Sequence, residues 1–406
     1  MNPSVLTVKG GDSIFLRKAG VFALEFLHCG ILKFPCIGPT SKKTEINSRK
    51  VERGHTMKSK KIAAGIFIAF VITVSLVVLP AADCAAAETT KVKIGYLHTL
   101  AVDGQFWLGE HYGFWEQYGI KFEPIRFYTG IDLFQALSGG SIDMLITGAV
   151  ISNWPARGQG KVFLINNIEF GTAQLWVQPD SGINSLKDLK GKKISTTRGT
   201  TAHVFLHNAL KSVGLAETDA EGKYKNVTVV NQRMSEAVSS FVSGAVPAVA
   251  MWVPFNVIIE KNVPGAKKIS EASEFFPKAA IVGGWATTDE YWEKHRNGLL
   301  KQIVKAWIVA NEVLVYNPRQ SVEILSEKYY PEVPTSDLWE NFLAERVLPA
   351  ATWVDYYEDG TIDKWLDQVT NTYVEVGAFK NPRPAAEYFD SDLLPDVHGE
   401  VVLPLK

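Results

Sequence analysis

The sequence has 406 residues, of which 46% are hydrophobic, a composition typical of globular proteins and a length sufficient for two or three domains. Residues 1–87 carry 12 Lys and Arg against 5 Asp and Glu, which leaves 30 against 38 for residues 88–406. This acidic body disfavours nucleic acid as a partner. The three cysteines, Cys29, Cys36 and Cys84, all precede residue 88, which excludes disulfides, thiolate metal sites and cysteine nucleophiles from the remainder.

Residues 57–87 are predicted to be a secretory signal peptide. Three lysines precede an apolar run over 62–80, and small residues that fit Ala-x-Ala cleavage end at Ala87. We therefore expect an exported, periplasmic protein, with an uncleaved anchor as the alternative because the run is long enough to span a bilayer. Residues 1–56 show no helical or strand period, so we expect translation to start at Met57 and the upstream segment to be a misassigned extension.

After residue 88 the sequence alternates strand and helix patterns. Short apolar or alternating runs predict strands, and apolar residues three and four apart predict helices. The first elements expected are a strand at 92–97, a helix at 104–119, a strand at 120–127, a helix at 130–140, and strands at 142–147 and 161–167. The pattern restarts near residue 180, with a strand at 192–197, a helix from Thr201, a strand at 226–230, a helix through Ala237 and Phe241, and a strand at 248–252.

The restart predicts an α/β fold with two lobes, each a mixed sheet flanked by helices. Segments 173–179 and 279–288 are interpreted as crossing strands that join the lobes. The lobes expected are 88–178 with 283–406 (lobe 1) and 179–282 (lobe 2), with hinge segments near 175–182 and 279–286. Further helices are expected at 289–316, after Pro318, at 336–346 and at 362–376. Open α/β sheets bind ligands at the carboxyl ends of their strands, so the cleft between the lobes is the expected site.

Residues 194–210, ISTTRGTTAHVFLHNAL, place hydroxyl residues, Arg198 and Gly199 directly before a predicted helix. The unpaired N–H groups and partial positive charge of a helix N-terminus suit an anion, and a guanidinium can hold two oxygens at once. The stretch is therefore a candidate anion site, with an ordinary capped helix as the alternative.

Three segments carry a family likeness: GIDLFQALSGGSIDMLITGA (130–149), SLKDLKGKKISTTRGTTAHVFLHNALKSVGL (185–215) and SEAVSSFVSGAVPAVAMWVPF (235–255). They resemble the substrate-binding proteins of the taurine, alkanesulfonate and nitrate ABC importers, and the resemblance extends over about residues 90–320. It implies a two-lobed type II periplasmic binding protein. Such a protein closes on a small anion or zwitterion and delivers it to a membrane permease, and it needs no cofactor.

The resemblance also implies which residues contact the ligand. They follow predicted strands or begin predicted helices, so they should converge on the cleft. From lobe 1 they are His98, Thr99, Thr129, Gly130, Thr147, Gly148 and Ala149. From lobe 2 they are Arg198, Thr200, Thr201, His203, Trp252 and Pro254.

Several alternatives stay open at this point. His203 and His207 mimic a metal pair on one helix face, but no third ligand is evident, so we expect no metal. An enzyme on the same fold would lack the cysteine that related enzymes use, and a sensor would need a fused signalling domain. Taurine, alkane- or arylsulfonates, nitrate and small carboxylates all fit an anion site. Taurine is somewhat disfavoured, because the family often has an acid where Pro247 or Ala248 stands here. We expect a monomer.

Overall fold

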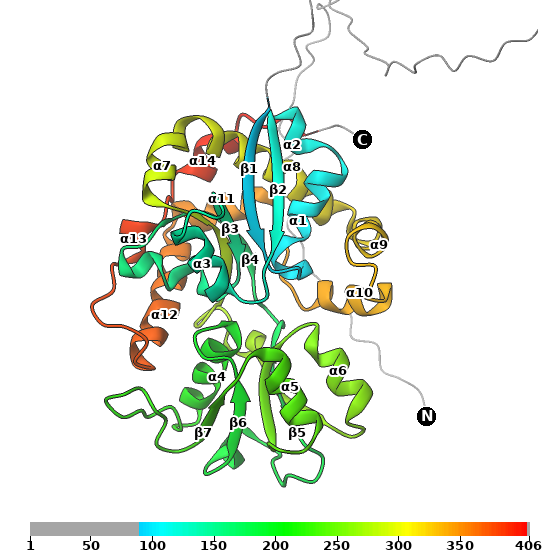
Figure 1. Cartoon of the computed structure of the whole chain (residues 1–406), viewed down its shortest axis with the longest axis vertical. Coiled ribbons are helices and arrows are strands. Elements are labelled where there is room, and N and C mark those ends of the chain that lie inside the picture. Colours follow the sequence, from blue (N-terminus) through cyan, green and yellow to red (C-terminus); the bar gives the residue numbers. More distant parts are fainter. Residues whose placement is uncertain (1–88, 404–406) are drawn as a thin grey trace, which may run out of the picture. The chain divides into compact units, whose positions relative to one another are not determined.

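The computed structural model describes residues 89–403. The signal peptide expected at 57–87 and the extension expected at 1–56 lie outside the described residues. Between residues 89 and 403, no helix combines the length and the apolar character needed to cross a membrane. This part of the chain contains two mixed five-stranded sheets, each flanked by helices (Figure 1), in agreement with the α/β prediction.

The first sheet has the strand order β2-β1-β3-β10-β4. Its strands are β1 (Thr90–Tyr96), β2 (Ile120–Arg126), β3 (Met144–Thr147), β4 (Lys161–Ile168) and β10 (Val282–Thr287). β1 is parallel to β2 and β3, whereas β10 is antiparallel to β3 and β4. The helices that share its core are α1 (Leu100–His111), α2 (Phe114–Gln117), α3 (Gly130–Ser138) and α8 (Lys301–Tyr316). The single helix expected at 104–119 is divided into α1 and α2, because Gly113 adopts a φ of 68° between them.

The second sheet repeats this arrangement, with the order β7-β6-β8-β5-β9. Its strands are β5 (Ala173–Val177), β6 (Lys193–Thr196), β7 (Thr228–Asn231), β8 (Ala248–Trp252) and β9 (Lys267–Glu271). β6 is parallel to β7 and β8, and β5 is antiparallel to β8 and β9. The flanking helices are α4 (Thr201–Ser212), α5 (Met234–Val242) and α6 (Phe255–Asn262).

The chain passes from the first sheet to the second at residues 169–172 and returns at residues 272–281. Residues 175–177 and 282–286, which belong to the segments interpreted as crossing strands, are paired in β5 and β10. We refer to residues 173–271, which hold the second sheet, as the second lobe, and to the other described residues as the first lobe.

The C-terminal part is mainly helical. Its helices are α7 (Asp289–His295), α9 (Pro318–Lys328), α10 (Thr335–Leu343), α11 (Ala350–Glu358), α12 (Thr361–Glu375), α13 (Ala385–Tyr388) and α14 (Leu393–His398). The helix expected at 289–316 contains a π-helical turn, Arg296–Leu300, between α7 and α8. Val369 and Tyr373 of α12 lie in the same hydrophobic cluster as Leu206 of α4, so α12 packs against the second lobe.

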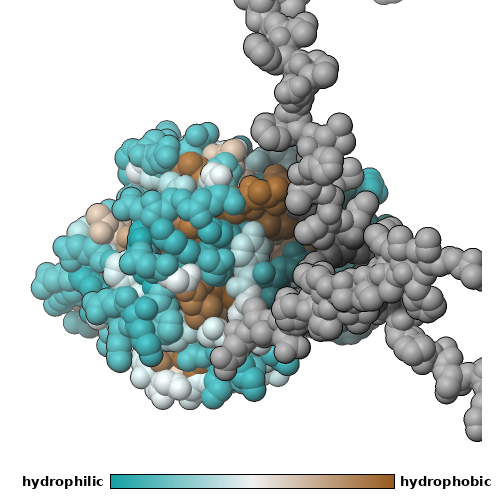
Figure 2. Space-filling view, turned by 90° about the horizontal axis from the view of Figure 1, so that it is seen from above, coloured by the Kyte–Doolittle hydropathy of each residue, from teal (hydrophilic) through white to brown (hydrophobic). Residues whose placement is uncertain are grey.

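Large aromatic side chains fill the first lobe. Trp115, Trp285 and Trp307 are fully buried there, and Trp154 stacks on Phe134 with ring centroids 5.1 Å apart. On the face shown in Figure 2, hydrophilic residues predominate and hydrophobic residues form small separate patches. Each sheet therefore has a hydrophobic core of its own.

Candidate functional site

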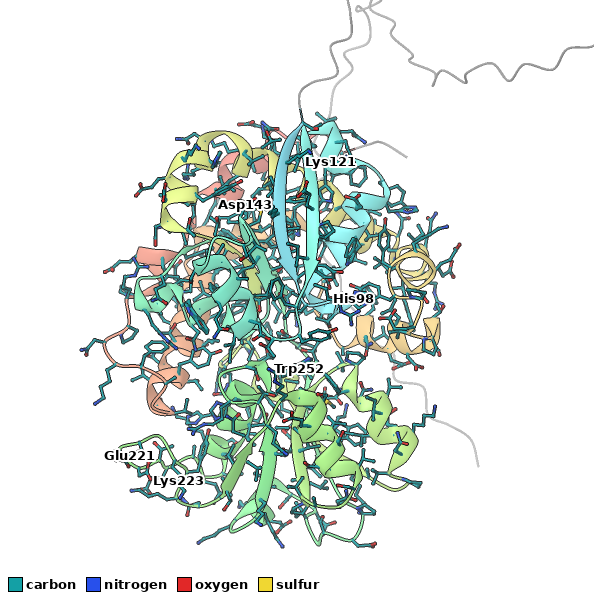
Figure 3. All side chains as sticks on the ribbon, in the orientation of Figure 1. His98, Lys121, Asp143, Glu221, Lys223 and Trp252 are labelled. Carbon is teal, nitrogen blue, oxygen red and sulfur yellow. The ribbon has the colours of Figure 1, made fainter. Side chains whose placement is uncertain are left out.

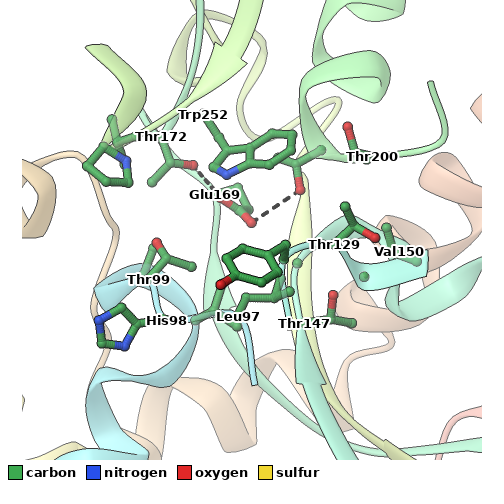
Figure 4. Close-up of a pocket in the computed structure, with 18 of the residues that line it drawn as sticks. Leu97, His98, Thr99, Thr129, Thr147, Val150, Glu169, Thr172, Thr200 and Trp252 are labelled. Atoms are coloured by element: carbon green, nitrogen blue, oxygen red, sulfur yellow. Dashed lines mark hydrogen bonds between the residues drawn. The ribbon is translucent and has the colours of Figure 1, made fainter. Parts of the chain in front are cut away.

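A cavity of about 180 Å³ lies between the two sheets (Figure 4). The first lobe contributes residues at or just after the carboxyl ends of β1, β2 and β3, which are 97–99, 126, 128–130 and 147–148. The second lobe contributes the start of α4 and the turn after β8, residues 200–201 and 252–255. Carboxyl ends of strands from both sheets thus face one space, the usual position of a ligand site in open α/β sheets.

The cavity brings together ten of the thirteen residues expected at the ligand. They are His98, Thr99, Thr129, Gly130, Thr147, Gly148, Thr200, Thr201, Trp252 and Pro254. In Figure 3, His98 and Trp252 lie close to the region between the sheets, although more than 150 residues separate them in the chain. Ala149, Arg198 and His203 do not line this cavity.

Glu169 is the carboxylate of the cavity. It belongs to the 169–172 segment, is 5% exposed, and accepts hydrogen bonds from the hydroxyls of Thr172 and Thr201, the latter at 3.3 Å (Figure 4). Burial raises the pKa of this carboxyl group. Among the described residues, no Lys or Arg forms an ion pair with it. A hydrogen-bond donor or a cation on a ligand would therefore find an acceptor here.

Gly148 allows Glu169 and Thr201 to lie this close to the first lobe. A Cβ atom at residue 148 would lie 2.7 Å from Thr201 Oγ1 and would also overlap the Glu169 carboxylate. Thr201 Oγ1 in turn accepts a hydrogen bond from the N–H of Ala149 at 3.1 Å. This explains the position of Ala149: its backbone binds the second lobe rather than the cavity.

The donors of the cavity are Arg126 and the first turns of three helices. Arg126 ends β2, and its guanidinium carbon lies 5.6 Å from the ring centroid of Tyr128. Thr99, Thr129 and Thr200 immediately precede α1, α3 and α4. The first N–H groups of a helix have no acceptor within it and carry partial positive charge, so this wall suits an anion.

The Thr147 hydroxyl is a further polar group beside the start of α3. It is fully buried, and its Oγ1 has no hydrogen-bond partner within residues 89–403. A Cβ atom on Gly130 would lie 2.6 Å from it, so glycine is required for α3 to begin here. Thr147 therefore can still bind a ligand oxygen or a water molecule.

His98 forms one edge of the cavity. Its φ of 58° is in the left-handed region, its ring stacks on Tyr330 at 4.6 Å between centroids, and its Nε2 lies 2.7 Å from Glu332 Oε1. Burial lowers the pKa of this imidazole. Trp252, across the cavity, packs edge-on against Phe255 at 6.0 Å and offers an apolar surface for the organic part of a ligand.

Arg198 lies on the opposite side of its loop from the cavity, contrary to the single anion site that the sequence suggested. Its guanidinium donates to the carbonyl oxygens of Gly222 at 2.7 Å and Val376 at 3.3 Å. Gly199, at a φ of 79°, turns the chain between Arg198 and Thr200, so the two side chains face different spaces.

His203 is also turned away from the cavity. It is 1% exposed, and its Nδ1 accepts a hydrogen bond from the N–H of Gly199 at 3.2 Å. His207, which could have formed a metal pair with it, has its Nε2 2.7 Å from Glu375 Oε2. No cluster of three or more metal-ligating side chains occurs in the described part of the chain.

Sequence reasoning missed Arg126, Tyr128, Glu169 and Thr172. Arg126 ends an alternating run that we did predict as a strand, so its position at a strand terminus was a usable signal. Glu169 and Thr172 lie in the passage between the sheets, which we expected several residues later. They could have been found only by predicting that the chain passes between the sheets at residues 169–172.

The chain is similar in sequence to known proteins. The model of the NMT1/THI5 like family matches residues 109–321. A binding protein of Brucella abortus (strain 2308) is 27% identical over 321 residues, which cover 79% of this chain and 96% of the relative. An aliphatic sulfonates-binding protein of Bacillus subtilis (strain 168) is 32% identical over 159 residues, which cover 37% of this chain and 44% of that protein.

Among solved structures, the alkanesulfonate-binding protein SsuA from Xanthomonas axonopodis pv. citri, bound to MOPS, has the same fold. It superposes with a TM-score of 0.60 at 19% identity and covers 75% of this chain and 100% of its own. The likeness identifies the periplasmic binding protein fold.

Proposed function

The chain belongs to the NMT1/THI5-like family, and we propose that it is an extracytoplasmic solute-binding protein that captures a small organic anion and delivers it to an ABC permease. The observation that carries the proposal is the cavity between the two sheets, which Arg126, three helix N-termini and Glu169 all line. Binding and release need only this polar cleft, so we propose no catalytic step.

The polarity of the cavity narrows the ligand class. An anionic head would bind the N–H groups and Arg126, and a donor at the other end of the ligand would bind Glu169. An aminosulfonate carries both groups, whereas nitrate and simple carboxylates have no cation for Glu169. We therefore propose a zwitterionic sulfonate, taurine or a slightly longer aminoalkanesulfonate. Related proteins often have an acidic residue where Pro247 or Ala248 stands here. In this chain Glu169 would take its place as the partner of the ligand's ammonium group.

The small volume of the cavity and the names of relatives also support a small sulfonate as the ligand. Drug-sized ligands occupy cavities of roughly 300–1,000 Å³, whereas this one has about 180 Å³. The Bacillus subtilis relative is named as an aliphatic sulfonates-binding protein. Export through residues 57–87 would place the protein in the periplasm, where a permease could receive its ligand.

A thermal-shift and calorimetric series tests the proposal. Taurine, a longer aminosulfonate, an unsubstituted alkanesulfonate, acetate and nitrate are compared at matched ionic strength. A ligand present at a hundred times its dissociation constant adds about 2.7 kcal/mol to the free energy of unfolding. We expect the aminosulfonates to bind most tightly and to be recovered unchanged. Preferential binding of nitrate or acetate would refute the sulfonate class, and turnover of a ligand would refute a pure binding role.

A further inference from the structure

A second cavity, of about 280 Å³, lies on the other side of the loop that begins α4. Arg198 and Gly199 line it, whereas Thr200 and Thr201 line the first cavity. The first lobe supplies Arg157, which follows β3 and precedes β4. The space therefore has one arginine from each lobe.

Both arginines lack a carboxylate partner. Within residues 89–403, neither Arg157 nor Arg198 takes part in an ion pair, whereas Arg296 pairs with Asp390 at 2.9 Å. Arg198 donates to two backbone carbonyls through one nitrogen, Nη2. Arg157 donates from Nη2 to Asn153 Oδ1. Each guanidinium has five N–H donors, so most of the donors of both remain for a ligand.

Aromatic rings hold Arg157 in place. Its guanidinium carbon lies 5.1 Å from the ring centroid of Trp154 and 4.9 Å from that of Phe379. A guanidinium stacked in this way keeps its N–H edge directed outward, which is the geometry that oxyanions require. The second lobe offers the matching group, Arg198, which is held by the carbonyl oxygens of Gly222 in the second lobe and Val376 in the first lobe.

The positive charge of this cavity is not neutralised by its other lining groups. Glu221 is the one carboxylate that lines it, and that side chain is exposed on an outer loop of the second lobe (Figure 3). Burial and the charge of Arg198 lower the pKa of His203 to about 3, so this imidazole is neutral. Arg157 is exposed and Arg198 is half-buried, so both cations can be reached by a dissolved anion. Two guanidiniums against one exposed carboxylate leave the cavity with a surplus of positive charge for such an anion.

We propose that this second cavity is an anion site for a tetrahedral oxyanion, either free phosphate or sulfate or the terminal group of a phosphomonoester, held between Arg157 and Arg198. The two guanidiniums come from different lobes, so the bound anion would bridge the lobes. The site is separate from the one proposed for the sulfonate, and it does not depend on that proposal.

Binding of inorganic phosphate, measured by calorimetry at constant ionic strength with chloride as the balancing salt, tests the site. We expect one phosphate per chain and at least a tenfold loss of affinity in Arg157→Gln and in Arg198→Gln, the usual effect of removing a charged hydrogen bond. Arg319→Gln is the matched control, because Arg319 also stacks on an aromatic ring, Trp339 at 5.0 Å, but lies outside this cavity. Glycerol phosphate distinguishes a phosphomonoester from the free ion.

Two controls distinguish the second cavity from the first one and a loss of binding from a loss of folding. Arg126→Gln should leave phosphate binding unchanged. If it abolishes binding while Arg157→Gln does not, phosphate occupies the main cavity and the proposal is wrong. Arg198 also holds two backbone carbonyls, so its loss can unfold the loop. Arg157→Gln removes no backbone contact, and circular dichroism will confirm its fold. Wild-type phosphate affinity in folded Arg157→Gln, or no saturable phosphate binding at all, would overturn the second site.

Discussion

The carboxyl group of Glu169 meets two hydroxyl donors but no cation, and this imbalance leads to a charge-specific prediction. Glu169→Gln keeps the size of the side chain and removes its charge. We expect the affinity for an aminosulfonate to fall by about ten- to a hundredfold, because a charged hydrogen bond contributes about 1.5–3 kcal/mol. The affinity for an alkanesulfonate without an amino group should change by less than about threefold.

Calorimetry with both ligands measures this difference directly. Glu271→Gln is the control, since Glu271 is also partly buried near a passage between the sheets but pairs with Lys268 outside the cavity. If Glu169→Gln weakens both sulfonates equally, Glu169 supports the shape of the cavity and does not select an ammonium group.

At the scale of the element, α1 depends on a buried acid in its first turn. Asp103 is fully buried and accepts hydrogen bonds from the N–H of Thr99 at 2.9 Å, the Trp107 indole at 3.0 Å and the Tyr330 hydroxyl at 2.9 Å. These bonds hold the start of α1 beside the cavity. Burial nevertheless raises the pKa of Asp103 to about 7.

A raised pKa in the folded state gives a defined pH dependence. The contribution of Asp103 is fully present below its unfolded pKa, about 4, and is lost as the pH rises through about 7. The free energy of unfolding should therefore fall by up to about 4 kcal/mol from this group between pH 4 and pH 7. Urea unfolding across this range should show a flatter profile in Asp103→Asn than in the wild type. An identical slope in both proteins would mean that Asp103 ionises normally in the fold.

Elements differ in how much of their structure the sequence reveals. The expected helix at 130–140 agrees with α3 (130–138), and the one at 362–376 agrees with α12 (361–375), because both have a clear apolar period. No sequence pattern marked the π-helical turn at 296–300, so one helix was expected where α7 and α8 stand. The direction of Arg198 depends on one backbone angle at Gly199, which no side-chain pattern encodes.

At the scale of the whole molecule, the repeated strand and helix pattern was sufficient to predict two mixed sheets. It placed the hinge segments near 175–182 and 279–286 and did not delimit the passages at 169–172 and 272–281, because these residues have no period of their own. Glu169 was missed for that reason, although it is central to the cavity. The packing of α12 on the second lobe could not be predicted either, because the apolar face of a helix does not indicate which lobe it packs against.

Closure of the two lobes is the prediction that belongs to this scale. Arg126 and Thr129 of one lobe and Thr201 and Trp252 of the other line the cavity, so the proposed ligand would contact both lobes and would bind better when they are close together. A ligand shifts an equilibrium only through such differential affinity. Small-angle X-ray scattering should therefore give a smaller radius of gyration with saturating aminosulfonate than without it. Arg126→Gln, at a ligand concentration below its dissociation constant, should keep the larger radius. A radius that does not change on saturation would indicate that the cavity is rigid and that the passages at 169–172 and 272–281 are not hinges.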